Sequence, residues 1–216
     1  MVNRAVFQTA CHCGDCFEPD VRFCAPLVIE RIIDDKPATL SPFYRAAMTP
    51  AIYTASIPVF KQMLGGLQSV LHKAQTHALE RKIEPSALLQ ARLFPDMFPL
   101  LRQVQVACDF ATSVCARLAG VEVVKMDDSG QGFDDLQQRI NAVMGFLNGL
   151  SESQFADAAT REIVTQAGTP KEKRFNGRSY LFTYGLPHFF FHTTTAYAIL
   201  RHNGVEVGKK DYLGSN

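Results

Sequence analysis

The chain has 216 residues, of which 47% are hydrophobic and 20% charged, as is typical of a globular protein long enough to bury one sizeable core. Lysine and arginine number 22 and aspartate and glutamate 21, so the net charge is close to zero. This balance, without any basic run, excludes the electrostatic profile of a nucleic-acid-binding protein, and nucleic acid is not an expected partner.

The first 47 residues contain four prolines and show neither helical nor strand periodicity. From Met48 onward apolar residues recur regularly, so we predict an N-terminal extension over residues 1–47 and one helical domain over residues 48–214. The extension is expected to be disordered or to result from a mis-assigned start codon. The start also lacks the apolar run of a signal peptide or a lipoprotein anchor, which predicts a cytoplasmic protein.

Six cysteines are present, but their positions do not form the framework of a secreted disulfide-rich protein. Four of them surround His12, with a spacing C-x-C-x2-C-x7-C that lacks the paired C-x2-C elements of common zinc modules. A zinc site is therefore the less favoured interpretation, and an extension without a role of its own is the more favoured one. The four are Cys11, Cys13, Cys16 and Cys24.

A first helix is predicted over residues 49–82, because apolar residues recur at the spacing of one helical face. Ser56 has the context of an N-cap with Pro58 in the first turn, which places the rigid part of the helix after Ser56. Gly65 and Gly66 lie in the helix interior, where each costs about 1 kcal/mol relative to alanine. A close helix crossing at that point would offset the cost.

The segment LFPDMFPLLRQVQVACDFATSVCARLAG is the clearest amphipathic helix in the chain. We expect Asp96 to cap it, Pro99 to lie in its first turn and Gly120 to end it in the left-handed conformation. Cys108 and Cys115 fall on its apolar stripe and are predicted to be buried small hydrophobic residues. The rest of the stripe is Leu100, Leu101, Val104, Ala107, Ala111, Val114 and Leu118.

A third helix is predicted from about Asp134 to Leu147, followed by a short turn with the capping-box pattern SESQ. The segment REIVTQAGTPKEKRFNG then breaks the helical period, and its strand-forming IVT and its AGTP turn predict a small exposed hairpin. A last helix follows from near Ser179 to Gly204. Four amphipathic helices with short links predict an all-α four-helix bundle with a small hairpin between helices three and four.

Residues 180–200 of the last helix contain no charged side chain and are long enough to cross a hydrocarbon layer of about 30 Å. Pro187, two histidines and three successive threonines lower the hydropathy of this stretch well below that of a Leu- and Ile-rich span. Such a helix is typical of the centre of a soluble bundle, so a membrane is not an expected partner. Pro187 also predicts a kink or a restart of the helix just before His188.

Two strings, ARLFPDMFPLLRQVQVACD and LPHFFFHTTTAYAILRHNGVEVGKKDYLG, resemble the bacterial domain-of-unknown-function branch of the DinB/YfiT-like helical-bundle superfamily. The resemblance covers residues 48–214, and the C-terminal string is its most specific part. It implies a DinB-like four-helix bundle, usually homodimeric, with no established activity for this branch. Gly65, Gly66 and the aromatic last helix also suggest more apolar surface than one bundle buries, which favours a homodimer.

Better-known relatives in that superfamily hold a divalent metal with three histidines, one from the second helix and two from the fourth, and some transfer low-molecular-weight thiols. His188 and His192 match the pair on the fourth helix, whereas the second helix has Gln103 and Gln105 where a histidine ligand is expected. At positions i and i+4 the two imidazoles can share an ion such as Zn, Ni or Fe. The third donor would be His77, or an oxygen atom of Asp96, Asp109 or Gln103.

The alternative is that His192 is a core histidine with an ordinary hydrogen-bond partner and that His188 lies near the end of the bundle. We favour this alternative because no third ligand is evident, so no cofactor is certain. The expected function is then a dimeric bundle that binds a small molecule or has a structural role. The second hypothesis is a divalent-metal-dependent enzyme of the thiol-transferase type that uses His188 and His192, and the third is a stress-related interaction protein.

The C-terminal string RHNGVEVGKKDYLG is expected to be a tail that Tyr212 and Leu213 hold against the bundle or against a second subunit. The less favoured hypothesis is that charged residues of this string line a pocket for an anion or a substrate. The candidate pocket-lining residues of the chain are Gln103, Asp96, Asp109, Tyr184, Tyr197 and Arg201.

Overall fold

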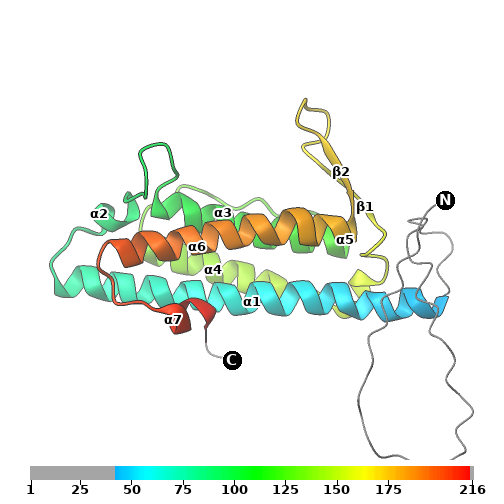
Figure 1. Cartoon of the computed structure of the whole chain (residues 1–216), viewed down its shortest axis with the longest axis horizontal. Coiled ribbons are helices and arrows are strands. Elements are labelled where there is room, and N and C mark those ends of the chain that lie inside the picture. Colours follow the sequence, from blue (N-terminus) through cyan, green and yellow to red (C-terminus); the bar gives the residue numbers. More distant parts are fainter. Residues whose placement is uncertain (1–41, 215–216) are drawn as a thin grey trace, which may run out of the picture. The chain divides into compact units, whose positions relative to one another are not determined.

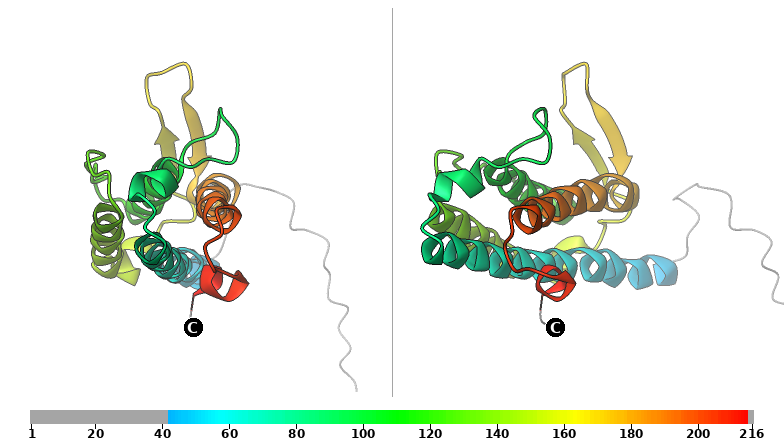
Figure 2. Two further views of the ribbon diagram at one scale, coloured as in Figure 1. Left: turned by 90° about the vertical axis from the view of Figure 1, so that its left-hand side faces the viewer. Right: turned by 60° about the vertical axis from the view of Figure 1, so that its left-hand side comes forward.

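The computed structural model describes residues 42–214, with side chains from residue 51 onward. Four long helices form the bundle: α1 (Pro42–Glu80), α3 (Leu100–Ala119), α4 (Phe133–Asn148) and α6 (Leu186–His202). α3 packs against α6 and α4, and α1 packs against α4 and α6, as the end-on view in Figure 2 shows. The predicted four-helix bundle is confirmed (Figure 1).

The predicted boundary at Met48 lies within α1, which begins at Pro42. The cysteine cluster with His12 lies outside the described residues. The interpretation of residues 1–47 as an extension therefore stays a prediction.

Ser56 is not the N-cap of the first helix. It is buried inside α1, and its hydroxyl donates to the carbonyl oxygen of Ile52, one turn earlier, at 2.6 Å. A serine within a helix commonly satisfies its hydroxyl in this way. Pro58 consequently lies in the helix interior, and the prediction was wrong because a Ser-x-Pro signal carries no information about a helix that already precedes it.

The start of α3 also differs from the prediction. Pro99 is the N-cap, with an extended backbone (ψ 164°), so Asp96 does not cap the helix. Asp96 lies instead in the loop that follows α2 (Pro85–Leu89). The predicted end is confirmed, because Gly120 adopts the left-handed conformation with φ 71°.

The core forms where the apolar stripes of the four helices meet. All nine residues predicted for the stripe of α3 are buried, and Cys108 and Cys115 are completely so. Phe60 of α1 meets Phe189 of α6 edge to face, with ring centroids 4.7 Å apart. The stripe of α4 is also buried as predicted, through Leu136, Ile140, Val143 and Leu147.

The C-terminal tail packs on α1 at Gly66. A Cβ atom at Gly66 would lie 2.4 Å from the carbonyl oxygen of Tyr212 in α7 (Lys209–Leu213). The predicted anchoring by Tyr212 on the chain's own bundle is therefore confirmed, and Gly66 serves this contact rather than a second subunit. Leu213 contributes through its carbonyl oxygen, which accepts from Gln62 Nε2 of α1 at 3.0 Å, while its side chain is 40% exposed.

A short 3₁₀ helix (Glu152–Phe155) and the predicted hairpin connect α4 to α6. Strands β1 (Glu162–Thr165) and β2 (Lys173–Asn176) pair antiparallel. A short helix α5 (Gly177–Ser179) and a π-helical segment (Tyr180–Gly185) then lead into α6. The last helix is thus interrupted just before Pro187, as its sequence predicted.

The loop between α2 and α3 and the hairpin both project from the side of the bundle formed by α3 and α6 (Figure 1, Figure 2). This side therefore carries a helical face with a protrusion at each end. Across residues 42–214, no helix is both long and apolar enough to span a bilayer.

Candidate functional site

His192 of α6 forms a hydrogen bond with Gln103 of α3 in the interior of the bundle. The residues are 7% and 2% exposed, and His192 Nδ1 lies 2.7 Å from Gln103 Oε1. Gln103 Nε2 donates to the carbonyl oxygen of Phe98 at 3.1 Å, which orients the amide with its oxygen toward the imidazole. Because an amide oxygen only accepts, we assign the ring proton to Nδ1. The nitrogen of His192 that carries a lone pair is therefore Nε2.

The environment keeps this imidazole neutral. Burial, and to a smaller extent the charges of His188 and Arg102, lower the pKa of His192 from 6.5 to about 4. Among the described residues no hydrogen bond uses Nε2 of His192, and this atom is not one of the buried polar atoms that lack a partner. Nε2 therefore keeps some contact with solvent, although the residue as a whole is only 7% exposed. His192 can accept a hydrogen bond through Nε2, or use this atom as a base or a ligand.

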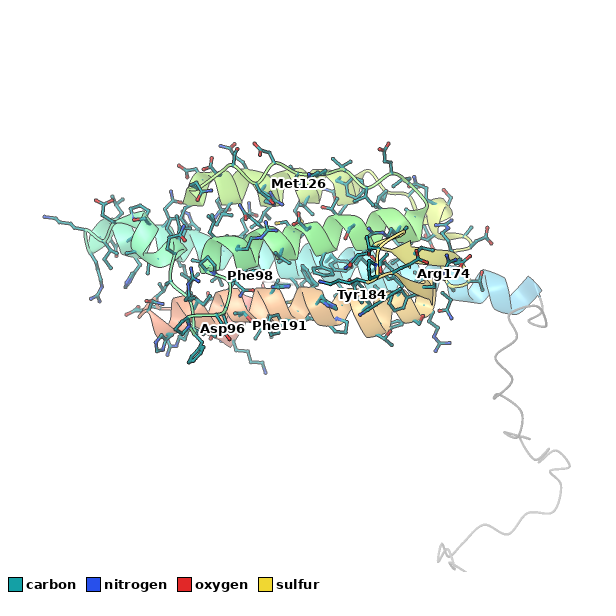
Figure 3. The ribbon with its side chains drawn as sticks, turned by 90° about the horizontal axis from the view of Figure 1, so that it is seen from above. Asp96, Phe98, Met126, Arg174, Tyr184 and Phe191 are labelled. Carbon is teal, nitrogen blue, oxygen red and sulfur yellow. The ribbon has the colours of Figure 1, made fainter. Side chains whose placement is uncertain are left out.

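His192 is one of the residues that line a hollow of about 220 Å³ on the side formed by α3 and α6. Figure 3 shows Asp96, Phe98 and Phe191 gathered at the same part of this side. Phe98 and Phe191 are 52% and 56% exposed, although both are large and apolar. The hollow is lined by Asp96, Met97, Phe98, Gln103, Phe191 and His192.

His188 lies one helical turn before His192 and has a different partner. Its Nδ1 donates to the carbonyl oxygen of Tyr184 at 2.7 Å, and its ring lies 4.4 Å from the Tyr184 ring, centroid to centroid. Phe110 of α3 stacks on His188 at 4.8 Å and on His192 at 5.9 Å, with an interplanar angle of 20° in both cases. Both imidazoles thus rest on one aromatic ring, and both keep Nδ1 engaged with the protein.

The aromatic contacts continue from Tyr184 to the hairpin. Phe175 of β2 packs on Tyr184 with centroids 5.3 Å apart, and Lys173 Nζ lies 5.6 Å from the centre of the Tyr184 ring. Tyr184 also stacks on Tyr180, whose hydroxyl accepts from Arg117 Nη1 at 2.9 Å. Figure 3 shows Tyr184 toward the hairpin on the same side of the bundle. Tyr184 therefore supports the hairpin and His188 and does not line the hollow at His192.

The predicted third histidine lies elsewhere. His77 lines a separate hollow of about 340 Å³, together with residues of α1 and with Glu206. In the part of the chain that the structure describes, no group of three His, Cys, Asp or Glu side chains could hold a metal ion. Gln103 Oε1, a proposed oxygen donor, already accepts from His192. The donors around His188 and His192 do not fit the three-ligand arrangement of a catalytic zinc site, and metal binding stays a prediction.

Asp109, Tyr197 and Arg201 do not line the hollow at His192 either. Asp109 Oδ1 binds Arg139 Nη2 at 2.5 Å in an ion pair between α3 and α4, and burial raises the pKa of Asp109 although Arg139 opposes this. Tyr197 packs on the ring of Tyr212 with centroids 5.5 Å apart. Arg201 is exposed in the last turn of α6. Asp109 and Tyr197 thus each face a neighbour that sequence spacing could not identify.

Sequence reasoning also missed residues of the site. Phe98 and Met97 lie in a proline-flanked loop, and Phe191 lies in an aromatic run, so neither context distinguishes an exposed ring from a core ring. Phe110 falls beside the apolar stripe of α3, and this position was the one available signal that it contacts a neighbouring helix.

Comparisons with known proteins agree with this architecture. A family described as "Domain of unknown function (DUF1993)" matches residues 52–213. The chain belongs to the DUF1993 family. A crystal structure of a DinB family member protein from Shewanella denitrificans is 42% identical to the chain, with a TM-score of 0.74 over 79% of this chain and 96% of that one. None of the curated proteins matches the chain. The resemblance to the DinB-like bundles is thus confirmed for this member of DUF1993.

Proposed function

We propose that this DUF1993 protein is a small-molecule-binding bundle that acts as a homodimer, with the hollow at His192 as its ligand site. The observation that carries the proposal is the His192–Gln103 pair, which holds a neutral imidazole in place and leaves its Nε2 available. Ligand sites typically combine apolar walls with a few well-placed polar groups. The exposed rings of Phe98 and Phe191 supply the walls, and His192 supplies the polar group.

The ligand site can be tested through the ring signals of the histidines. We expect some members of a mixed set of amines, alcohols, carboxylic acids and thiols to shift the imidazole NMR signals of His192 in the full chain. His202, exposed at the end of the same helix, serves as the internal control and should not shift. The assignment is made with the His192→Gln variant. The proposal fails if no compound moves the His192 signals further than those of His202.

An apolar hollow beside the ligand site supports a dimer. This second hollow, of about 430 Å³, lies between Leu93 and the outward face of α6 and shares Phe191 with the first. Residues 186–200 of α6 carry no charged side chain, so this face has little that binds water strongly. Exposed apolar patches of this kind commonly mark interaction sites, and a second copy seated here would bury the same face on both subunits. Its lining comprises Leu93, Pro187, Phe190, Phe191, Thr194, Thr195 and Ala198.

The dimer is tested by light scattering. The wild-type chain should give about twice its mass of 24.0 kDa at micromolar concentration. Phe191→Glu should yield the monomer, because it places a charge in the proposed interface. Phe182→Glu is the matched control, since Phe182 is 47% exposed and lies outside both hollows. A wild-type monomer, or equal effects of the two variants, would contradict this part of the proposal.

One observation favours the alternative, a divalent-metal-dependent enzyme of the thiol-transferase type. His188 and His192 both donate Nδ1–H to protein acceptors, which is the usual second contact of a metal-binding histidine. The two Nε2 atoms would then bind the ion, and a third donor such as Asp96 would have to move in. Elemental analysis of the protein without a histidine tag, beside the His188→Ala/His192→Ala variant, decides the matter. Our proposal predicts the same low metal content in both proteins. One ion per chain in the wild type that is lost in the variant would favour the enzyme.

A further inference from the structure

The hollow at His192 has an uneven distribution of charge. Its six lining residues include one carboxylate, Asp96, and neither lysine nor arginine. Arg102 helps to lower the pKa of His192, but it does not line the hollow, and its guanidinium forms an ion pair with Asp128 at 2.8 Å. An anionic ligand would therefore meet the negative charge of Asp96 without a cation among the lining residues to compensate for it.

The two phenylalanines and His192 in the lining also favour a cation over an anion. The faces of aromatic rings attract cations, and Phe98 and Phe191, which both line this hollow, are each more than half exposed. His192 is neutral and directs a lone pair, not a proton, to the solvent-exposed edge of its ring. The side chains thus offer acceptors and aromatic faces to a ligand that brings the donors.

We infer that the ligand class of this site is a small protonated amine with an apolar body, held by Asp96, His192 and the two phenylalanine rings. The inference rests on the proposed function and deepens it. The ammonium group would donate hydrogen bonds to the Asp96 carboxylate and to His192 Nε2, while the apolar body covers Phe98 and Phe191. Such a ligand complements Asp96, His192 and both phenylalanines, whereas carboxylates, phosphates and thiolates complement only the apolar walls.

The size of the hollow restricts the ligand further. Its volume of about 220 Å³ lies below the range of about 300–1,000 Å³ that drug-sized ligands occupy. A single ring with a short alkyl chain is therefore suitable. A series of 2-phenylethylamine, 2-phenylethanol and 3-phenylpropionate keeps the ring and varies the charge from positive through neutral to negative.

The experiment titrates each of these three probes into the full chain and follows the imidazole signals of His192 by NMR. We expect 2-phenylethylamine to bind most tightly, 2-phenylethanol more weakly and 3-phenylpropionate most weakly. Asp96→Asn should weaken binding of the amine about fivefold and leave that of the alcohol nearly unchanged, because only the charge is removed. Glu206→Gln is the matched control, since Glu206 is an exposed carboxylate in the hollow lined by His77, and it should have no effect on binding.

The outcomes separate this inference from the proposed function. If 3-phenylpropionate binds as tightly as the amine, or if Asp96→Asn does not weaken the amine, the amine inference is wrong while the ligand site stands. If none of the three probes shifts the His192 signals, the amine inference is wrong, and the ligand site is then judged by the mixed set of compounds described above. Because Asp96 is exposed in a loop, its substitution leaves the core intact, and an unchanged melting temperature of Asp96→Asn verifies this.

Discussion

Acid should destabilise this protein through His192. The folded state lowers the pKa of His192 from 6.5 to about 4, so the unfolded chain binds a proton in a pH range where the folded chain does not. The contribution of His192 to stability is therefore fully present above about pH 6.5 and is lost progressively as the pH falls toward 4. The sign follows from burial, which opposes the charged imidazole in the folded state only.

The magnitude follows from the same shift. Between pH 6.5 and about pH 5 the unfolded chain is protonated at His192 and the folded chain is not. This interval of roughly 1.5 pH units corresponds to a loss of about 2 kcal/mol in the free energy of unfolding, at about 1.4 kcal/mol per unit. Nε2 keeps some contact with solvent at the hollow, which partly screens the charge, so we reduce the expected loss to about 1 kcal/mol. This loss is a large fraction of the stability of a typical domain and is measurable by urea unfolding.

The assay compares the free energy of unfolding at about pH 7.5 and about pH 5 for three proteins. Wild type should lose about 1 kcal/mol more than His192→Gln, which removes the titrating group. His202→Gln is the control on the same helix and should behave like wild type. Equal losses in wild type and His192→Gln, or an NMR titration of the His192 ring near its ordinary pKa, would refute the reasoning.

Three further predictions concern stability. Gly66→Ala should lower the free energy of unfolding in urea by about 1–3 kcal/mol, because the added Cβ would lie 2.4 Å from the Tyr212 carbonyl oxygen. Gly65→Ala should raise it by up to about 1 kcal/mol, because a Cβ there would meet no described atom within 4 Å. Arg139→Met should cost about 2 kcal/mol in the same assay, because Asp109 and Asp128 lose the buried guanidinium that pairs with both of them. An unchanged unfolding midpoint would contradict this. Deleting residues 1–47 should leave the melting temperature by circular dichroism nearly unchanged, and a loss of folded protein would refute the extension.

The order and the buried faces of the helices were determined by the sequence alone. The nine apolar positions of α3 lie on one stripe because of the helical repeat, and all nine are buried. Gly120 ends that helix in the left-handed conformation, and the IVT and AGTP segments form the hairpin. These features depend on residues close together in the chain, so a local pattern is sufficient to predict them.

The predicted helix starts show where local patterns are insufficient. Ser56 and Asp96 both have the side chain of a helix cap, yet Ser56 lies inside α1 and Asp96 lies in the loop before α3. Likewise the glycine pair indicates a close approach but not which segment approaches, and the structure places the chain's own C-terminal α7 there. For the glycine pair the deciding partner is distant in the sequence, whereas for the two caps a local cap pattern does not show where the helix begins.

The candidate site was decided by the tertiary structure. The sequence identified His192 and Gln103 as polar residues of two different helices, 89 positions apart, but not that they form a hydrogen bond. That bond exists because α3 packs directly on α6, and the same packing leaves Phe98 and Phe191 exposed around one hollow while His77 lines another. Helical periodicity determines which face of a helix is apolar, whereas only the packing of one helix on another determines which side chains meet.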